Sequence, residues 1–165
     1  MEFWDLYTRG RTPTGKTHVR GEKIPAGCYH LVVHVWIRNT RGEYLISQRS
    51  ANRPTCPFMW ECVGGSVVAG ENSLDGAIRE VKEEVGLDLD PSNGKLVRSC
   101  LRVNDFLDVW CFSYDGDVSL ENATTDEVAQ VKWMTPTQIR ALLESGKLVD
   151  TLAYFFTDID QATEG

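Results

Sequence analysis

Residues 65–87 read GSVVAGENSLDGAIREVKEEVGL, and this stretch predicts a helix with one apolar face. Its apolar side chains recur at spacings of three and four residues, which places them on one stripe: Leu74, Ala77, Ile78, Val81 and Val85. Asn72 or Ser73 can cap the start of this helix, and Gly86 stands where a left-handed residue commonly ends one. Gly76, in the middle, is a poor helix former that costs roughly 1 kcal/mol against alanine.

The polar face of the same helix carries Glu80, Glu83 and Glu84, which lie together because positions three and four apart are neighbours. Free carboxylates this close repel one another, so the arrangement favours a divalent cation among them. Carboxylate oxygens on a helix suit Mg²⁺ or Mn²⁺ rather than zinc, and bound Mg²⁺ usually keeps substrate phosphate as a further ligand. The face therefore points to phosphoryl chemistry, although taken alone it is more often a solvated, charge-rich surface.

The spacing of the whole stretch decides between these two interpretations. From Gly65 to Leu87 it follows the pattern Gly-x5-Glu-x7-Arg-Glu-aliphatic-x-Glu-Glu-x-Gly-aliphatic. This pattern is the Nudix box, and the chain resembles the Nudix family at each of its fixed positions. The resemblance implies an α/β fold, a Nudix-type α/β/α sandwich with a central mixed β-sheet and a loop-helix-loop catalytic motif. The strand order over residues 28–145 is similar to that fold.

The resemblance also implies a metal-dependent hydrolase that cleaves a diphosphate linkage in a small nucleotide-like substrate. Glu80 and Glu84 correspond to the principal metal ligands and Glu83 to a third, and the backbone carbonyl of Gly65 often joins them in the family. The expected cofactor is Mg²⁺, or Mn²⁺. Water would attack a phosphorus atom while the metal ions polarise the phosphoryl oxygens.

Other box positions have supporting roles in the family. Arg79 is expected to orient a glutamate through a charged hydrogen bond. Gly65, Glu71 and Gly86 are expected to maintain the loop-helix-loop structure. The general base is less clearly indicated, because some members use a box glutamate, matching Glu80 or Glu83, and others an acid outside the box. The outside candidates are Asp105, Asp108, Glu121, Asp126 and Glu127, of which Glu127 is favoured because it begins the predicted strand at 127–133.

The box does not identify the group attached to the diphosphate, so the substrate contacts must come from other residues. Arginines can meet a phosphate, a histidine can bond a polar atom, and tryptophan can stack on a ring. The predicted substrate-binding residues are Arg49, Arg53, His30 and Trp60. Further candidates, more typical of core or solvated positions, are Arg20, His34, Tyr29 and Phe58.

Two segments, 29–39 and 49–60, also resemble isopentenyl-diphosphate isomerases, which share the Nudix fold. Those isomerases use a cysteine directly before a Gly-His pair, whereas the corresponding segment here is Cys62-Val63-Gly64-Gly65-Ser66. The chain thus resembles the isomerase-like branch of Nudix hydrolases. An isomerase and a non-catalytic ligand sensor stay open as alternatives. A pure sensor has little reason to keep three mutually repelling acids.

The remaining pattern predicts one domain, which suits a chain of 165 residues. It comprises an N-terminal extension at 1–27, a core at 28–145 and a C-terminal apolar segment at 146–165. Strands are predicted at 3–8, 28–38, 43–49, 96–103, 106–115 and 127–133, and loops at 9–27 and 50–59. A helix at 136–145 would begin at the cap Thr135, and residues 148–158 can form another.

Composition narrows the partners. The net charge of −7 disfavours binding along a nucleic-acid polymer, which needs a basic surface, but a bound metal ion still allows a small diphosphate-containing substrate. The five cysteines, odd in number and without a Cys-x-x-Cys pair, indicate free, mostly buried thiols in a reducing compartment. With no signal peptide and no apolar run of ~20 residues, we expect a cytoplasmic protein without membrane contact that can form a homodimer.

Overall fold

The computed structural model describes residues 1–161, and within them it contains a seven-stranded and a two-stranded sheet. The larger sheet is formed by β3 (His30–Arg38), β4 (Tyr44–Arg49), β5 (Trp60–Glu61), β6 (Val63–Ser66), β7 (Gly94–Leu101), β8 (Asp105–Ser113) and β9 (Val128–Met134). The smaller sheet is a hairpin of β1 (Phe3–Tyr7) and β2 (Pro13–Val19). The helical elements are α1 (Ser73–Val85), α2 (Pro136–Glu144) and the short turns Pro91–Asn93, Leu120–Asn122, Asp150–Leu152 and Phe155–Ile159.

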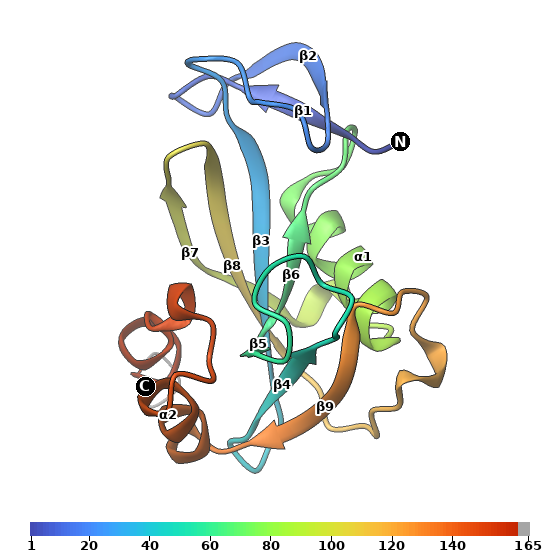
Figure 1. Ribbon diagram of the computed structural model, residues 1–165, viewed down its shortest axis with the longest axis vertical. Helices are drawn as coiled ribbons and strands as arrows, with labels where there is room; N and C mark the ends of the chain where they lie inside the picture. Colours follow the sequence, from blue (N-terminus) through green and yellow to red (C-terminus); the bar gives the residue numbers. More distant parts are fainter. Residues whose placement is uncertain (162–165) are drawn as a thin grey trace.

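Strand β3 occupies the centre of the larger sheet (Figure 1), whose order is β5-β4-β3-β8-β7. Strand β6 also pairs with β3, and β9 pairs with β4. Strands β3 and β8 run parallel, whereas the other pairings in this sheet are antiparallel. The sheet is therefore mixed, which confirms the predicted fold class.

Alternating side chains along β3 build a hydrophobic core on each face of the sheet. One face carries Leu31, Val33, Val35 and Ile37, which pack with Ala77, Val81 and Val85 of α1. The other face carries Trp36, which packs with Phe155 and Ile159 of the C-terminal segment. Figure 1 shows α1 on one side of β3 and the C-terminal segment with α2 on the other. The three layers follow directly from this two-residue period.

Helix α1 begins and ends where the sequence predicts. The Asn72 side chain accepts a hydrogen bond of 3.0 Å from the backbone N–H of Asp75, and the Asp75 carboxylate accepts one from Asn72. Gly86 ends the helix with a φ of 72°. Packing explains Gly76, because a Cβ there would lie 2.8 Å from Cγ2 of Val67. The missing side chain lets α1 approach the segment after β6.

The C-terminal segment is also close to prediction. Helix α2 begins at Thr135, whose hydroxyl accepts a hydrogen bond from the backbone N–H of Gln138. The apolar stretch after it is helical only in two short turns, from which Leu152, Phe155 and Ile159 are buried. Residues 162–165, the end of the predicted segment 146–165, lie outside the described residues.

The N-terminal extension departs from the prediction of a loop over residues 9–27, which is wrong for the seven residues of β2. Strand β2 pairs with β1 from Phe3–Val19 to Tyr7–Pro13, and this backbone pairing orders a segment whose composition indicates a loop. The hairpin joins the sheet through Tyr7 and Tyr29, whose backbones exchange hydrogen bonds of 2.7 and 2.9 Å.

Two predictions about the chain's environment meet the structure in different ways. All five cysteines are free, but only Cys62 is buried and Cys56 is exposed, so the expectation of mostly buried thiols is wrong. In the part of the chain that the structure describes, every helix is too short or too polar to cross a membrane.

Candidate active site

A cleft of about 150 Å³ lies between α1 and the Gly64-Gly65 pair of β6. Helix α1 contributes Glu80, Glu83 and Glu84, so the three acids predicted to lie together do line one cleft. Glu84 is the deepest, with 4% of its surface exposed. The opposite wall comes from distant parts of the sequence, namely Glu2, Arg20, Arg53 and Glu127.

Arg79 ties the acids of this cleft together. Its Nε donates to Glu71 Oε1 at 2.8 Å, and its Nη1 donates to Glu80 Oε1 at 2.9 Å and to Glu83 Oε2 at 3.0 Å. Its Nη2 donates to the carbonyl of Ser66 at 3.0 Å. Although burial opposes the charge, the hydrogen bond to Glu71 and the charge of Glu80 raise the pKa of Arg79. One guanidinium group thus joins three carboxylates to the backbone at the end of β6.

The two glycines of β6 are required by close approach. A Cβ on Gly65 would lie 2.4 Å from the carboxyl carbon and Oε1 of Glu80. A Cβ on Gly64 would lie 2.5 Å from the carbonyl oxygen of Val33. The first obstacle is the end of a flexible side chain and the second is the backbone of β3. Gly65 therefore leaves room for the Glu80 carboxylate, and Gly64 leaves room for strand pairing.

Burial makes the carboxyl groups of the cleft hard to ionise. It raises the pKa of Glu84 to about 8, with further contributions from the charges of Glu80 and Glu61, while a hydrogen bond from the Gly64 backbone opposes the shift. Burial likewise raises the pKa of Glu80, against the opposing effect of Arg79. Perturbed acids gathered in a cleft are typical of functional sites.

The end of β4 and the loop after it place the two predicted arginines, with Arg53 in this cleft and Arg49 in the hollows beside it. Arg49 is buried and donates from Nη1 to both carboxylate oxygens of Glu61, at 2.8 and 2.9 Å. Its Nε also donates to the carbonyl of Thr55 at 2.9 Å. Arg53 forms an ion pair with Glu127. Both arginines also line an adjoining hollow of about 280 Å³.

A third hollow, of about 180 Å³, opens on the other side of Gly64 and Gly65. Its walls include Arg49, Arg53 and Glu61 together with Val32, His34, Val149 and Leu152. The three hollows share residues, so a substrate could extend from the acids of α1 across the glycine pair.

Two predicted substrate residues, His30 and Trp60, line none of these hollows. His30 is buried and stacks on Trp4 of β1, with ring centroids 4.1 Å apart. Trp60 is buried in the core beneath the C-terminal segment, and Lys132 Nζ lies 5.4 Å from its ring centroid. Their aromatic character reflects packing, so we drop both from the candidate site.

The five acids considered as an outside base are distributed unevenly. Glu127 lines the cleft with the acids of α1, whereas Asp126 lines only the neighbouring hollow. Asp105 pairs with Arg102 at 2.5 Å, and Asp108 binds Arg11 at 2.5 Å, both outside these hollows. Glu121 is exposed in the Leu120–Asn122 turn.

The prediction missed two side chains at the candidate site, Glu61 in the hollow of about 180 Å³ and Glu2 in the cleft. Glu61 lies on β5 between buried Trp60 and Cys62, and an acid inside a buried strand is a signal that sequence reading could have used. Glu2 pairs with Arg20 at 2.9 Å at the open end of the β1–β2 hairpin. No local pattern could have indicated that second placement.

The N-terminal hairpin is tied to the loop that precedes α1. The backbone N–H of Ala69 donates to the carbonyl of Phe3 at 2.8 Å, and the backbone N–H of Gly70 donates to Asp5 Oδ2 at 2.8 Å. These bonds hold the Glu2–Arg20 pair beside the acids of α1.

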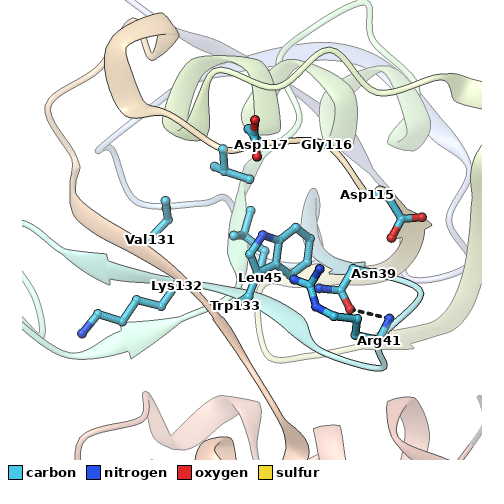
Figure 2. Close-up of a pocket in the computed structure, with 10 residues that line it drawn as sticks. Asn39, Arg41, Leu45, Asp115, Gly116, Asp117, Val131, Lys132 and Trp133 are labelled. Atoms are coloured by element: carbon cyan, nitrogen blue, oxygen red, sulfur yellow. Dashed lines mark hydrogen bonds between the residues drawn. The ribbon is translucent and has the colours of Figure 1, made fainter.

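A larger hollow of about 440 Å³, lined by Trp133 and Lys132 of β9 together with Asn39, Arg41 and Asp115, is shown in Figure 2. None of the acids of α1 lines it. Arg41 is bound to Glu43 at 2.9 Å, and Asp115 accepts from Thr40. The chemistry is therefore concentrated in the smaller cleft.

The NUDIX domain model matches residues 29–155, which include the cleft acids of α1 and all strands of the larger sheet. The chain belongs to the NUDIX family. A Nudix relative named as an uncharacterized Nudix hydrolase of Listeria innocua is 41% identical over 157 residues, covering 94% of this chain and 91% of its own length. The protein is thus a hydrolase of the Nudix type.

Two further comparisons place this Nudix chain more broadly. The crystal structure of DR0079 from Deinococcus radiodurans superposes with a TM-score of 0.73 at 22% identity, covering 90% of this chain and 92% of that one. That likeness confirms the fold. The isopentenyl-diphosphate Delta-isomerase of Shigella flexneri is 29% identical over 80 residues, covering 48% of this chain and 44% of its own length.

Proposed function

We propose that this Nudix hydrolase depends on a divalent metal ion and cleaves a diphosphate linkage in a small nucleotide-like substrate. The observation that supports this most strongly is the grouping of Glu80 and Glu83 on Arg79, beside the Gly65 backbone, with Glu84 buried next to them. Acids of α1 on one wall, with Arg20 and Arg53 on the other, suit a metal–diphosphate complex.

The donor atoms fit Mg²⁺ or Mn²⁺. Glu80, Glu83 and Glu84 offer carboxylate oxygens and Gly65 a carbonyl oxygen, which are ligands for a hard cation. Burying Glu84 beside Glu80 is unfavourable for two free anions, and a cation removes that repulsion. Within residues 1–161 no three acidic, histidine or cysteine side chains are already gathered as a metal site, so Glu80 and Glu83 would exchange Arg79 contacts for the ion. The bound metal would polarise phosphoryl oxygens and acidify water.

The remaining roles are assigned to groups on the opposite wall. Arg53 would bind a phosphate oxygen, and Arg49, saturated by Glu61 and Thr55, would position the loop that carries Arg53. Glu127 would accept the proton of the attacking water, because it alone of the five candidate bases outside the box lines the cleft itself. Its ion pair with Arg53 would hold it there.

The decisive experiment measures phosphate release from nucleoside triphosphates, sugar nucleotides, dinucleotides and prenyl diphosphates, with and without Mg²⁺. We expect Glu80→Gln and Glu84→Gln to lower turnover about a hundredfold or more, the loss typical for removing a group that stabilises transition-state charge. Both variants should keep the wild-type circular dichroism spectrum. Glu144→Gln, on the exposed side of α2, is the matched control. Near-normal activity of either cleft variant would contradict the metal assignment.

Isomerisation of isopentenyl diphosphate is the second candidate, favoured by the partial match to the Shigella enzyme. The site argues against it. Cys62 is buried and burial raises the pKa of its thiol well above the usual range, so it is a poor acid or nucleophile. Dimethylallyl product formed without phosphate release would reverse this order of preference.

A small substrate, rather than a nucleic-acid polymer, is part of the same proposal, because the cleft has a volume of only about 150 Å³ and the chain has a net charge of −7. The predictions of a single domain, a cytoplasmic location and a homodimer stay predictions. Size-exclusion chromatography with light scattering tests the last of them.

A further inference from the structure

His34 of β3 is one of three side chains that are linked in a row by hydrogen bonds. Trp36 Nε1 donates to Tyr154 Oη at 3.0 Å, and Tyr154 Oη lies 2.8 Å from His34 Nδ1. The rings of His34 and Tyr154 are stacked, with centroids 5.9 Å apart and an interplanar angle of 14°. These hydrogen bonds connect the central strand to the C-terminal segment.

The hydrogen bonds of Tyr154 determine which nitrogen of His34 carries the proton. An indole N–H can only donate, so Tyr154 Oη accepts from Trp36 and has one proton of its own to donate. Among residues 1–161, His34 Nδ1 is the acceptor within its reach. A proton on Nδ1 would leave the phenol hydrogen buried and unpaired, at a cost of about 1–3 kcal/mol. The stable arrangement therefore has Tyr154 donating to Nδ1, and the His34 proton on Nε2.

The Nε2–H edge of His34 faces the 180 Å³ hollow beside Gly64. A Cβ built on Gly64 would lie 3.1 Å from His34 Cδ2, the ring carbon bonded to Nε2. Nε2 has no hydrogen-bond partner among the described residues, but it is not one of their fully buried polar atoms that lack a partner. The atom is therefore reached from the hollow.

We propose that His34 is a specificity-determining residue, and that its Nε2–H selects substrates whose diphosphate carries, through a sugar, a single-ring base with a hydrogen-bond acceptor, as in a pyrimidine nucleoside. The volume of about 180 Å³ lies below the ~300 Å³ of pockets for larger ligands, so one ring fits. Val32, Val149 and Leu152 supply apolar walls for its faces, while Arg53 remains on the phosphate side. This inference rests on the proposed function.

The first test does not depend on activity. Long-range ¹H–¹⁵N spectra of the histidine side chains should show His34 with a proton on Nε2 and none on Nδ1, the signals being assigned by their loss in His34→Phe. Tyr154→Phe should release this preference, while the control Tyr114→Phe, whose hydroxyl bonds the carbonyl of Asp117, should not. A proton on Nδ1 in the wild type would overturn the inference.

The second test compares uridine 5′-diphosphate with its analogue in which phenyl replaces uracil, in the presence of Mg²⁺. The wild type should favour the uridine compound in kcat/KM by roughly tenfold, the effect of one hydrogen bond. His34→Phe should abolish that ratio. A ratio that persists in His34→Phe, or hydrolysis of other diphosphates but not of this pair, would refute the role of His34.

Failure of the proposed function is distinguishable from failure of this inference. If no diphosphate is cleaved, the proposed function fails while the selection by His34 is still judged by binding. Adding uridine 5′-diphosphate should then shift the His34 Nε2–H signal, and the phenyl analogue should not. Equal or absent shifts with both compounds would refute the inference.

Discussion

Replacing Gly65 by alanine would displace the Glu80 carboxylate without disturbing the sheet. The new Cβ would lie 2.4 Å from the carboxyl group, whereas real Cβ contacts stay beyond 3.0 Å. The carboxylate must therefore retreat by at least 3.0 − 2.4 = 0.6 Å, which also disrupts its 2.9 Å bond from Arg79. Since a displacement near 1 Å can lower turnover about a hundredfold, we expect a loss of that order in kcat/KM for Gly65→Ala.

Gly64→Ala is the matched comparison because its obstacle is different. Its Cβ would lie 2.5 Å from the carbonyl oxygen of Val33, which belongs to the backbone ladder between β3 and β6. That carbonyl cannot rotate away, so overpacking should lower the free energy of unfolding by about 1–3 kcal/mol.

The assay is urea unfolding, followed by circular dichroism, together with steady-state phosphate release for both variants. Gly65→Ala should unfold within about 1 kcal/mol of the wild type, because the end of a side chain yields easily. Full activity of Gly65→Ala, or wild-type stability of Gly64→Ala, would refute the reasoning from these contacts.

Three further predictions concern stability. Gly76→Ala should destabilise the protein by about 1 kcal/mol, because the new Cβ would meet three atoms of Val67, although helix propensity alone predicts a gain of similar size. Urea unfolding of Gly76→Ala, with and without Val67→Ala, checks this, and a more stable Gly76→Ala variant would contradict it. Burial lowers the pKa of His34 from 6.5 to about 3, so the unfolded chain takes up the proton first and the free energy of unfolding falls as the pH drops below 6.5. Between pH 7.5 and 5.5 this free energy should fall by about 1.4 kcal/mol more in the wild type than in His34→Asn. Equal losses in the two proteins would refute a neutral His34 ring. Thr135→Ala should cost about 1 kcal/mol through loss of the cap on the Gln138 N–H, measured as a lower melting temperature, and an unchanged value would exclude that cap.

Features encoded by neighbouring residues could be predicted from the sequence. Helix α1 follows from its apolar spacing, its C-cap Gly86 was expected, and its N-cap Asn72 was one of two candidates, with Ser73. The convergence of Glu80, Glu83 and Glu84 follows from the helical period. These features depend on interactions within about one or two turns of helix, which a single sequence records directly.

Features that depend on distant pairing could not be predicted in the same way. Strand β2 is ordered by pairing with β1, whereas its own composition indicates a loop. His30 and Trp60 were taken as substrate residues by type, but Trp4 and the C-terminal segment cover them. The Arg49–Glu61 pair joins residues on two neighbouring strands. The sequence shows which side chains have the chemistry to bind a substrate, but only the fold determines whether they face a cleft or the core.

The tie between the N-terminal hairpin and the loop before α1 bears on how this protein should be produced. Met1 is exposed and adjoins Glu2, which lines the cleft. A purification tag fused to Met1 would therefore obstruct the entrance of the cleft to substrate. Figure 1 shows the segment that follows α2, up to residue 161, beside that helix and away from the cleft. A tag placed there would leave the entrance unobstructed, and kinetic constants from the two preparations should differ mainly in KM.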